Sequence, residues 1–331
     1  MHILIIGAAG MLGRKITSAI LADPTIGGRT VTALSLVDLI APQAPDWPTG
    51  RVSARAADLG GYAAPAELIE GRPEVIIHLA AVVSADAEVH FDKGYRVNVD
   101  GTRALLEAVR HAGDAYRPRL VFASSLAVFG PPFPNRIPDD FAPAPRTSYG
   151  TQKVIAELLI NDYSRKGMID GVSLRLPTIS IRPGKPNAAA SGFFSGIIRE
   201  PLIGQPAALP VPDTTRHWHA SPRSAAGFFL HAAGMDTASL GHRRALNMPG
   251  LSTTVAEQIE ALRAVAGQGA IDLIRPAPDP LVANIVGGWG GNYEASRARA
   301  LGFITEGSFE DIIKVHIEDE LGGALPGPAA N

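Results

Sequence analysis

The chain has 331 residues, 46% of them hydrophobic and 19% charged, which predicts a folded protein with a substantial buried core. The formal net charge is -2 without a basic block, which argues against a nucleic-acid-binding protein. The absence of cysteine excludes disulfides, thiolate catalysis and cysteine-ligated metals, and we expect no metal site. We see no signal-peptide pattern and no apolar segment of about 18 residues, so we expect a soluble cytoplasmic protein without membrane partners.

The N-terminal segment predicts a strand, a glycine-rich turn and a helix. Residues 2–6 are apolar, as in a buried parallel strand, and the helix-like stretch ends near residue 21. In this context Gly7 makes the tight turn, Gly10 lets the backbone approach a pyrophosphate and Gly13 permits close helix packing. The helix N-terminus then faces the phosphates of a dinucleotide. The residues expected to bind it are Gly7, Gly10, Met11, Leu12 and Gly13.

An acidic residue follows the second predicted strand, at residues 30–36. Asp38 stands where a carboxylate accepts hydrogen bonds from the adenosine ribose and repels a 2′-phosphate. Its distance from Gly13 is slightly long, which we attribute to a loop insertion at 23–29. Asp38 therefore favours NAD over NADP, and a solvated aspartate at a strand end is the alternative.

Two further strands, at 52–56 and 75–81, end in residues suited to a flat cofactor. Small side chains close the second strand, and a polar turn follows the first. His78 is more typical of a packed structural histidine than of a catalyst. Loop polarity alone would explain Asp58 equally well. The expected cofactor contacts are Asp58, Leu59, Leu79, Ala80 and Ala81.

Polar side chains also lie at the ends of later strands, where parallel sheets bind ligands. The strand at 120–123 ends in Ser124 and Ser125. In the loop beyond the preceding strand, Ser84 and Asp86 are weaker candidates for contact with a substrate.

The segment 148–153 places Tyr149 four residues before Lys153 at the start of a predicted helix. Residues at i and i+4 lie on one helical face, so the phenol and the ammonium can meet in one cleft. A nearby cation favours the phenolate and lowers the pKa of tyrosine from its usual value near 10. The pair is a candidate general base, although chance also produces such a spacing.

Taken together and in this order, the motifs resemble the extended short-chain dehydrogenase/reductase superfamily, which contains nucleotide-sugar epimerases and dehydratases. The likeness covers about half of the chain. It rests on Gly7-x-x-Gly10-x-x-Gly13, Asp38, Asp58-Leu59, His78-Leu79-Ala80-Ala81, Asn98-x-x-Gly101-Thr102, Ser124-Ser125-x-x-Val128-Phe129-Gly130 and Tyr149-x-x-x-Lys153.

The resemblance implies NAD as the cofactor and gives several residues a role. Ser125, Tyr149 and Lys153 would form the catalytic set, with Tyr149 as the base in hydride transfer. Asn98 would belong to the cofactor or relay environment. After a strand at 171–176, Pro177 and Thr178 would lie near the nicotinamide, and with Tyr149 and Lys153 they complete the cofactor site.

Two positions depart from the patterns of the superfamily. Phe129 stands where the family usually carries tyrosine, a change that touches no catalytic role. Leu126 and Ala127 follow Ser125 where the dehydratase branch has an Asp-Glu pair, so 4,6-dehydration is not expected.

The second half resembles a narrower group of the superfamily, the dehydrogenases that oxidise the 2-hydroxyl of a four-carbon sugar acid with NAD. The implied need is a cation for a small carboxylate. Arg182 is the leading candidate, because a guanidinium binds a carboxylate through two parallel hydrogen bonds, and a surface or ion-pair role is the alternative. His219 and Trp289 are further pocket candidates, although Trp289, in a glycine-rich loop at 281–292, would equally serve as a packing anchor. The substrate site is thus predicted to contain Ser84, Ser125, Tyr149, Arg182, His219 and Trp289, and the likeness rests on residues 1–11, 182–187, 191–200 and 216–222.

Two other functions stay open. A nucleotide-sugar 4-epimerase would need several cations for a diphosphate, which Arg182, Arg199, Arg216 and Arg223 could supply. A non-catalytic NAD-binding sensor would usually lack the tyrosine–lysine pair that this chain keeps.

The predicted fold is α/β, a doubly wound parallel (Rossmann) sheet with a smaller α/β C-terminal substrate region. Family resemblance suggests a homodimer through the helices that begin near Asn98 and Tyr149. Helices are also predicted at 192–198, 221–233, 253–266 and 295–301, with a last sheet strand at 245–248 and a helix cap at Ser221 and at Ser252 or Thr253. We predict an NAD-binding domain made of residues 1–176 and 214–248. Residues 177–213 and 249–321 are predicted to form the substrate-binding region, and residues 322–331 a flexible tail.

Overall fold

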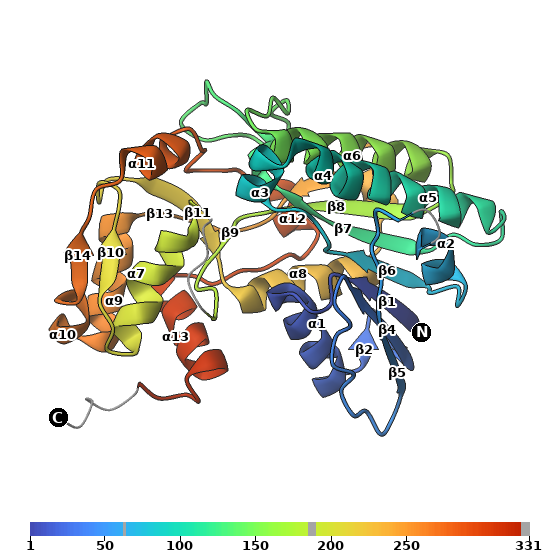
Figure 1. The fold of residues 1–331 in the computed structure, drawn as a ribbon, viewed down its shortest axis with the longest axis horizontal. Helices are drawn as coiled ribbons and strands as arrows, with labels where there is room; N and C mark the ends of the chain where they lie inside the picture. Colours follow the sequence, from blue (N-terminus) through green and yellow to red (C-terminus); the bar gives the residue numbers. More distant parts are fainter. Residues whose placement is uncertain (62–63, 185–189, 326–331) are drawn as a thin grey trace.

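The computed structural model describes residues 1–61, 64–184 and 190–325. At its centre lies a seven-stranded sheet with the order β12-β8-β7-β6-β1-β4-β5, and every neighbouring pair in it is parallel (Figure 1). The order reverses at β1, so the predicted doubly wound fold is confirmed. The strands are β1 (His2–Ile6), β4 (Ala33–Asp38), β5 (Arg51–Ala56), β6 (Val75–His78), β7 (Arg119–Ser125), β8 (Asp170–Leu176) and β12 (Ala245–Asn247).

Helices cover both faces of this sheet because successive residues of a buried strand point to opposite sides. In β1, Ile3 and Ile5 pack into a core shared with α1 (Met11–Ala22) and α8 (Pro222–Gly234). Leu4 and Ile6 pack into a second core on the other face. The helices of that face are α2 (Ala64–Ile69), α5 (Thr102–His111) and α6 (Ser148–Arg165), and Figure 1 shows the sheet between the two helix layers.

The predicted insertion after α1 forms a small antiparallel hairpin, β2 (Thr25–Ile26) with β3 (Arg29–Thr30). Gly27 and Gly28 make its turn at φ values of +56° and +74°. The second sheet strand therefore begins at Ala33, three residues later than predicted, because the chain turns back before it enters the sheet.

The predicted helix around Asn98 is interrupted by a wider turn. The chain runs through α3 (Ser84–Val89) and α4 (Phe91–Tyr95) into a π-helical turn, Arg96–Gly101, before α5 begins. Such wide turns often accompany functional sites, and this one contains Asn98.

The smaller part builds its own core from Phe194, Ile197 and Leu262 among others, and Figure 1 places it beside the large sheet. The exact domain boundaries stay a prediction. One sheet contains β9 (Thr178–Ile179), β11 (Arg216–Ala220) and β13 (Leu251–Thr254), and another contains β10 (Ala207–Leu209) and β14 (Ile274–Pro276). The helices of this part are α7 (Gly192–Leu202), α9 (Val255–Ala266), α10 (Gln268–Ile271), α11 (Pro280–Gly287) and α13 (Phe309–Glu320), whereas α12 (Ser296–Ala300) packs against β12 of the large sheet.

Two of the predicted helix starts can be compared with the structure. Ser221 caps α8 as predicted, accepting the Ser224 N–H at 2.9 Å. The cap of α9 is Thr254, which forms a capping box with Glu257. The prediction of Ser252 or Thr253 was wrong because β13 continues to Thr254, and its pairing with β11 delays the helix. Of the predicted tail, residues 326–331 lie outside the described residues.

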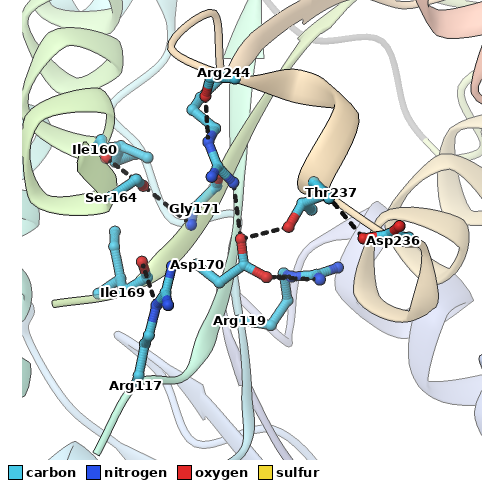
Figure 2. A network of polar contacts seen from close by, with 12 residues as sticks. Arg117, Arg119, Ile160, Ser164, Ile169, Asp170, Gly171, Asp236, Thr237 and Arg244 are labelled. Carbon is cyan, nitrogen blue, oxygen red and sulfur yellow. Dashed lines mark hydrogen bonds and ion pairs between the residues drawn. The ribbon is translucent and has the colours of Figure 1, made fainter. Parts of the chain in front are cut away.

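A polar network joins the strands at the amino edge of the large sheet (Figure 2). Asp170, the first residue of β8, accepts hydrogen bonds from Arg119 at 3.0 and 2.7 Å, from Thr237 at 2.7 Å and from Arg244 at 2.8 Å. Burial opposes the ionisation of Asp170, but these partners outweigh it and lower the pKa of the carboxyl. The network is therefore a fixed structural feature of this edge.

A cavity of about 430 Å³ opens at the same edge, lined among others by Arg29, Arg72, Arg117 and Glu74. None of the residues that line it belongs to the predicted site. No helix in the described stretches combines the length and apolarity needed to cross a membrane.

Candidate active site

The glycine turn after β1 has the shape that a dinucleotide needs. Gly7 has a φ of +94°, and a Cβ there would lie 2.7 Å from the Ala80 nitrogen. At Gly13 a Cβ would lie 2.5 Å from the Ala8 Cα, so the helix packs on the turn only with glycine. Packing within the protein itself thus accounts for glycine at positions 7 and 13. Around Gly10 the nearest atom would be 3.3 Å away, and this position leaves the turn open to a ligand.

The N-terminus of α1 and the carboxylate of Asp38 stand beside this turn. Gly10 caps α1 without a side chain, so no side chain satisfies the first-turn N–H groups of Met11 and Leu12. The Asp38 carboxylate accepts the Ala9 N–H at 2.9 Å and the Leu39 N–H at 2.7 Å. These groups fit NAD, with the helix end for its pyrophosphate and Asp38 for its ribose hydroxyls.

The other predicted cofactor residues form the rim of this turn. Leu79 and Ala80 donate their N–H groups to the Ile6 oxygen at 2.8 and 3.0 Å, because β6 ends at His78 and not at residue 81. Asp58 pairs with Arg96 at 2.8 Å, and this hydrogen bond chiefly lowers the pKa of Asp58. Leu59 is buried in the core against α5. For Asp58 and Leu59, contact with the adenine stays a prediction.

His78 is a structural histidine, as the sequence indicated. Its ring is 1% exposed, and Nε2 lies 3.0 Å from the Thr102 hydroxyl. Burial lowers the pKa of His78 to about 3, so the ring is neutral at physiological pH.

The Asn98 amide is fully engaged inside the protein. Its Oδ1 accepts the Val82 N–H at 2.8 Å, and its Nδ2 donates to the Val82 oxygen at 2.9 Å and to Gln152 Oε1 at 2.7 Å. Both amide hydrogens are thus used. Asn98 fixes the segment after β6 against α6 and so positions the cofactor environment through the backbone.

The start of α6 brings Tyr149 to Ser125. Thr147 caps this helix by accepting the Gly150 N–H at 3.1 Å, which places Tyr149 in the first turn. A Cβ at Gly150 would collide with the backbone oxygen of Ala127, so only glycine lets α6 approach the chain directly after β7. The Ser125 hydroxyl then lies close enough to the Tyr149 phenol to favour the phenolate.

Lys153 lies one helical turn further on, with its Nζ 5.4 Å from the centre of the Tyr149 ring. It is 2% exposed and donates to the Ala123 oxygen at 2.7 Å. Burial lowers the pKa of Lys153 to about 7, opposed by the charge of Glu157. The structure thus brings Ser125, Tyr149 and Lys153 together at the carboxyl edge of the large sheet.

The electrostatics of Tyr149 differ from the expectation for a tyrosine–lysine pair. Burial raises the pKa of Tyr149 to about 12, and the charge of Arg182 and the Ser125 hydrogen bond oppose this rise. Arg182 is the cation that chiefly opposes this rise, while the Lys153 Nζ is directed at the Ala123 oxygen; an effect of Lys153 on the Tyr149 pKa stays a prediction.

Arg182 follows β9 and is held by neutral oxygens. Its Nε donates to the Ile179 oxygen at 3.0 Å, and a terminal nitrogen donates to the Ser191 hydroxyl at 3.0 Å. Arg199 donates to the backbone oxygen of Arg182 at 2.6 Å. Within the described residues no carboxylate forms an ion pair with Arg182. Its charge is therefore available beside Tyr149.

The other predicted substrate residues have different surroundings. His219 is 0% exposed, and its nitrogens contact Ser180 at 3.2 Å and Gln258 at 3.0 Å, so the structure does not bring it to the site surface. Ser84 begins α3 and is partly buried. Asp86 pairs with Lys93 and His90, each at 2.7 Å. Contact of Ser84 with a substrate stays a prediction.

The segment around Trp289 is not only a loop. Residues 280–287 form α11, capped by Asp279, because Asp279 and Pro280 give a strong helix start. Trp289 follows this helix with its ring 5.3 Å from that of His217. Sequence reasoning passed over His217, whose Nε2 lies 2.6 Å from the Thr178 hydroxyl. The alternation along β11, which puts His217 on the same face as His219, was the available signal.

The last two predicted cofactor residues, Pro177 and Thr178, follow β8. Pro177 is buried between β8 and β9, and Thr178 is partly exposed at the start of β9. In the part of the chain that the structure describes, no group of three or more His, Asp or Glu side chains is arranged to hold a metal ion.

Known proteins resemble this chain over most of its length. Residues 3–218 match the model of the NAD dependent epimerase/dehydratase family. D-erythronate dehydrogenase from Cupriavidus necator is 47% identical, over 96% of this chain and 98% of that protein. D-erythronate dehydrogenase from Haemophilus influenzae is 40% identical, over 97% of this chain and 100% of that protein.

A crystal structure described as a nucleoside-diphosphate-sugar epimerase from Agrobacterium tumefaciens is 60% identical, with a TM-score of 0.96 over 98% of this chain and 96% of that one. The family model and the two relatives named as dehydrogenases support a dehydrogenase that uses NAD. The chain belongs to the NAD dependent epimerase/dehydratase family, in which it is an NAD-dependent dehydrogenase.

Proposed function

We propose that this dehydrogenase oxidises the 2-hydroxyl of D-erythronate to the corresponding 2-oxo acid. The observation that carries the proposal is the Arg182 guanidinium, held by neutral oxygens and close enough to Tyr149 to act on its pKa. A cation next to a base suits a substrate whose carboxylate neighbours the reacting hydroxyl. The two relatives named D-erythronate dehydrogenase support this substrate.

In the proposed mechanism Tyr149 takes the proton of the substrate hydroxyl. Bound NAD supplies the hydride acceptor at its nicotinamide. Ser125 donates a hydrogen bond to the same substrate oxygen and stabilises the charge that develops there. Since burial raises the pKa of Tyr149 to about 12, the phenolate depends on positive charge nearby. Arg182 supplies such charge, and Lys153 adds to it when protonated, a form that Glu157 favours.

The arginines distinguish the dehydrogenase from a nucleotide-sugar 4-epimerase, the second candidate that the Agrobacterium tumefaciens structure suggests. Three of the four candidate cations for a diphosphate already pair with carboxylates: Arg199 with Glu200, Arg216 with Glu257, and Arg223 with Glu318 and Asp319. One available cation at Arg182 fits a single carboxylate better than a diphosphate.

We also propose a homodimer through α5 and α6. Leu158 on α6 is 63% exposed, an apolar side chain that a partner helix would cover. Sedimentation of wild type and of Leu158→Glu checks this, with a monomeric variant expected. A wild-type chain that sediments as a monomer would contradict the dimer.

The function is tested by measuring NADH formation with a panel of four-carbon sugar acids and UDP-sugars. We expect NADH from D-erythronate and none from UDP-galactose. Interconversion of UDP-galactose and UDP-glucose without net NADH would instead establish the epimerase. Binding of NAD without turnover of any substrate would indicate a sensor.

A further inference from the structure

His217 on β11 has no role in the mechanism above, although it lies at the site. It shares one face of the strand with His219, and the two rings are 5.4 Å apart. His219 is occupied by Ser180 and Gln258, whereas His217 places Nε2 2.6 Å from the Thr178 hydroxyl oxygen. This short contact is the observation from which the inference starts.

Aromatic packing fixes the orientation of the His217 ring. Phe194 stacks on it with centroids 5.2 Å apart and an interplanar angle of 8°. Trp289 lies 5.3 Å away at 37°, and His219 meets it edge-on at 81°. The side chain is only 7% exposed. A ring held in this way cannot turn Nε2 away from Thr178 without disturbing these contacts.

The ring is neutral at physiological pH. Burial lowers the pKa of His217 to about 4, and the charge of Arg182 adds to this, while the backbone of Gly290 opposes it. A backbone group that raises an imidazole pKa favours the proton, so the Gly290 group is its carbonyl oxygen. Its contact falls short of a full hydrogen bond, and Nδ1 has no other partner in the described residues. We therefore infer that the proton lies on Nδ1, beside the Gly290 carbonyl, and that Nε2, at 2.6 Å from the Thr178 hydroxyl, is the acceptor.

This assignment determines what Thr178 offers to a ligand. A threonine hydroxyl has one proton, and with His217 in this tautomer Thr178 donates that proton to Nε2 across the 2.6 Å contact. The Thr178 oxygen then presents only lone pairs. Such an oxygen accepts a hydrogen bond from a hydroxyl and disfavours a carboxylate. The charge of Arg182 acts on both Tyr149 and His217, so the base and the Thr178–His217 pair lie around the same guanidinium.

We propose that the Thr178–His217 pair determines substrate specificity by accepting a hydrogen bond from a substrate hydroxyl beyond the reacting carbon. The inference rests on the proposed function, in which Arg182 holds the carboxylate at the other end. Sequence analysis expected Thr178 beside the nicotinamide. Its strand β9 pairs with β11 in the small sheet, and we therefore infer that the oxygen faces the substrate. A 2-hydroxy acid without further hydroxyls would leave this acceptor unpaired.

The test compares kcat/KM for D-erythronate with that for (R)-2-hydroxybutyrate, which lacks the two outer hydroxyls. We expect wild type to prefer D-erythronate by about 100-fold or more. Thr178→Val and His217→Phe should each reduce this preference about tenfold or more, without a change in the KM for NAD. The matched controls Thr178→Ser and His217→Gln keep a hydroxyl and an acceptor, so they should retain most of the preference.

Two results would overturn the proposal. One is an unchanged preference in Thr178→Val and His217→Phe, and the other is a raised KM for NAD with the preference intact. Should wild type form no NADH from D-erythronate, the proposed function fails, and the pair is tested in the free enzyme by ¹⁵N NMR. We expect an unprotonated His217 Nε2 whose shift changes in Thr178→Val and not in Thr178→Ser. A protonated His217 Nε2 would refute the proposed hydrogen bond from Thr178 to His217.

Discussion

The two edges of the large sheet both hold arginines, and they use them differently. At the amino edge Arg119, with a side chain 15% exposed, pairs with Asp170, which also binds Arg244 (Figure 2). At the carboxyl edge Arg182 donates to the neutral oxygens of Ile179 and Ser191, and its charge acts on Tyr149. An arginine matched by a carboxylate ties strands together, whereas one held by neutral oxygens keeps its charge for an incoming anion.

The difference follows from the cost of burying charge. A buried cation without an anion is unfavourable, and burial lowers the pKa of Arg182, which Tyr149 partly offsets. Lys153 is in the same situation, and its pKa falls to about 7. Uncompensated charge thus gathers where the catalytic residues lie. At the amino edge, in contrast, Asp170 matches the charges of Arg119 and Arg244 within the protein.

The largest effect should come from removing the base at the carboxyl edge. Tyr149→Phe is expected to lower kcat by about 10²–10⁴, because it removes the proposed general base. Binding of NAD, measured by calorimetry, should survive, since the glycine turn and Asp38 are untouched. Near-wild-type turnover would show that another residue is the base.

Removing the Arg182 cation at the same edge should lower the activity of the enzyme on the sugar acid. Arg182→Met is expected to lower kcat/KM for D-erythronate by about 30- to 1000-fold, the equivalent of about 2–4 kcal/mol for a lost charged contact. Steady-state kinetics over a range of acid concentrations provide the measurement. If thermal unfolding shows a large loss of stability instead, Arg182 is a structural arginine like Arg119.

The reciprocal change at the amino edge should affect stability and spare catalysis. Arg119→Met removes its hydrogen bonds to Asp170 and Ala232, and we expect a loss of about 1–3 kcal/mol in the free energy of unfolding. Urea denaturation measures the loss, with kcat/KM determined at a temperature where the variant is folded. A fall in kcat/KM as large as that of Arg182→Met would erase the distinction between the edges.

The smallest effect concerns acid stability. The pKa of Asp170 is lower in the folded than in the unfolded chain, so its contribution is present above the usual pKa near 3.8 and is lost as pH falls through the folded value. Asp170→Asn should therefore lower the free energy of unfolding near pH 7. It should also reduce the further loss of this free energy as the pH falls. Denaturation curves between pH 7 and pH 3 test this, with Asp162→Asn at an exposed ion pair as the control. An equal loss of unfolding free energy on acidification in wild type and Asp170→Asn would contradict this prediction.

Local patterns in the sequence predicted much of the architecture. The apolar run of β1 with its glycine turn indicated the dinucleotide fold, and Ser221 with Pro222 indicated the start of α8. Each of these signals lies within a few residues and depends on local interactions. The start of α9 was misplaced because pairing between β11 and β13 extends the strand, a contact between residues nearly forty positions apart.

The predictions for the site divide in the same way, into those that follow from local spacing and those that depend on tertiary contacts. The spacing along the chain was enough to predict that Tyr149 and Lys153 share a helical face and that Gly7, Gly10 and Gly13 shape a tight turn before α1. The tertiary structure decided which cation acts on Tyr149, that His219 is enclosed and that His217 meets Thr178. The physical reason is that burial and long-range contacts set the charge and the proton of each group, and neither is written in local spacing.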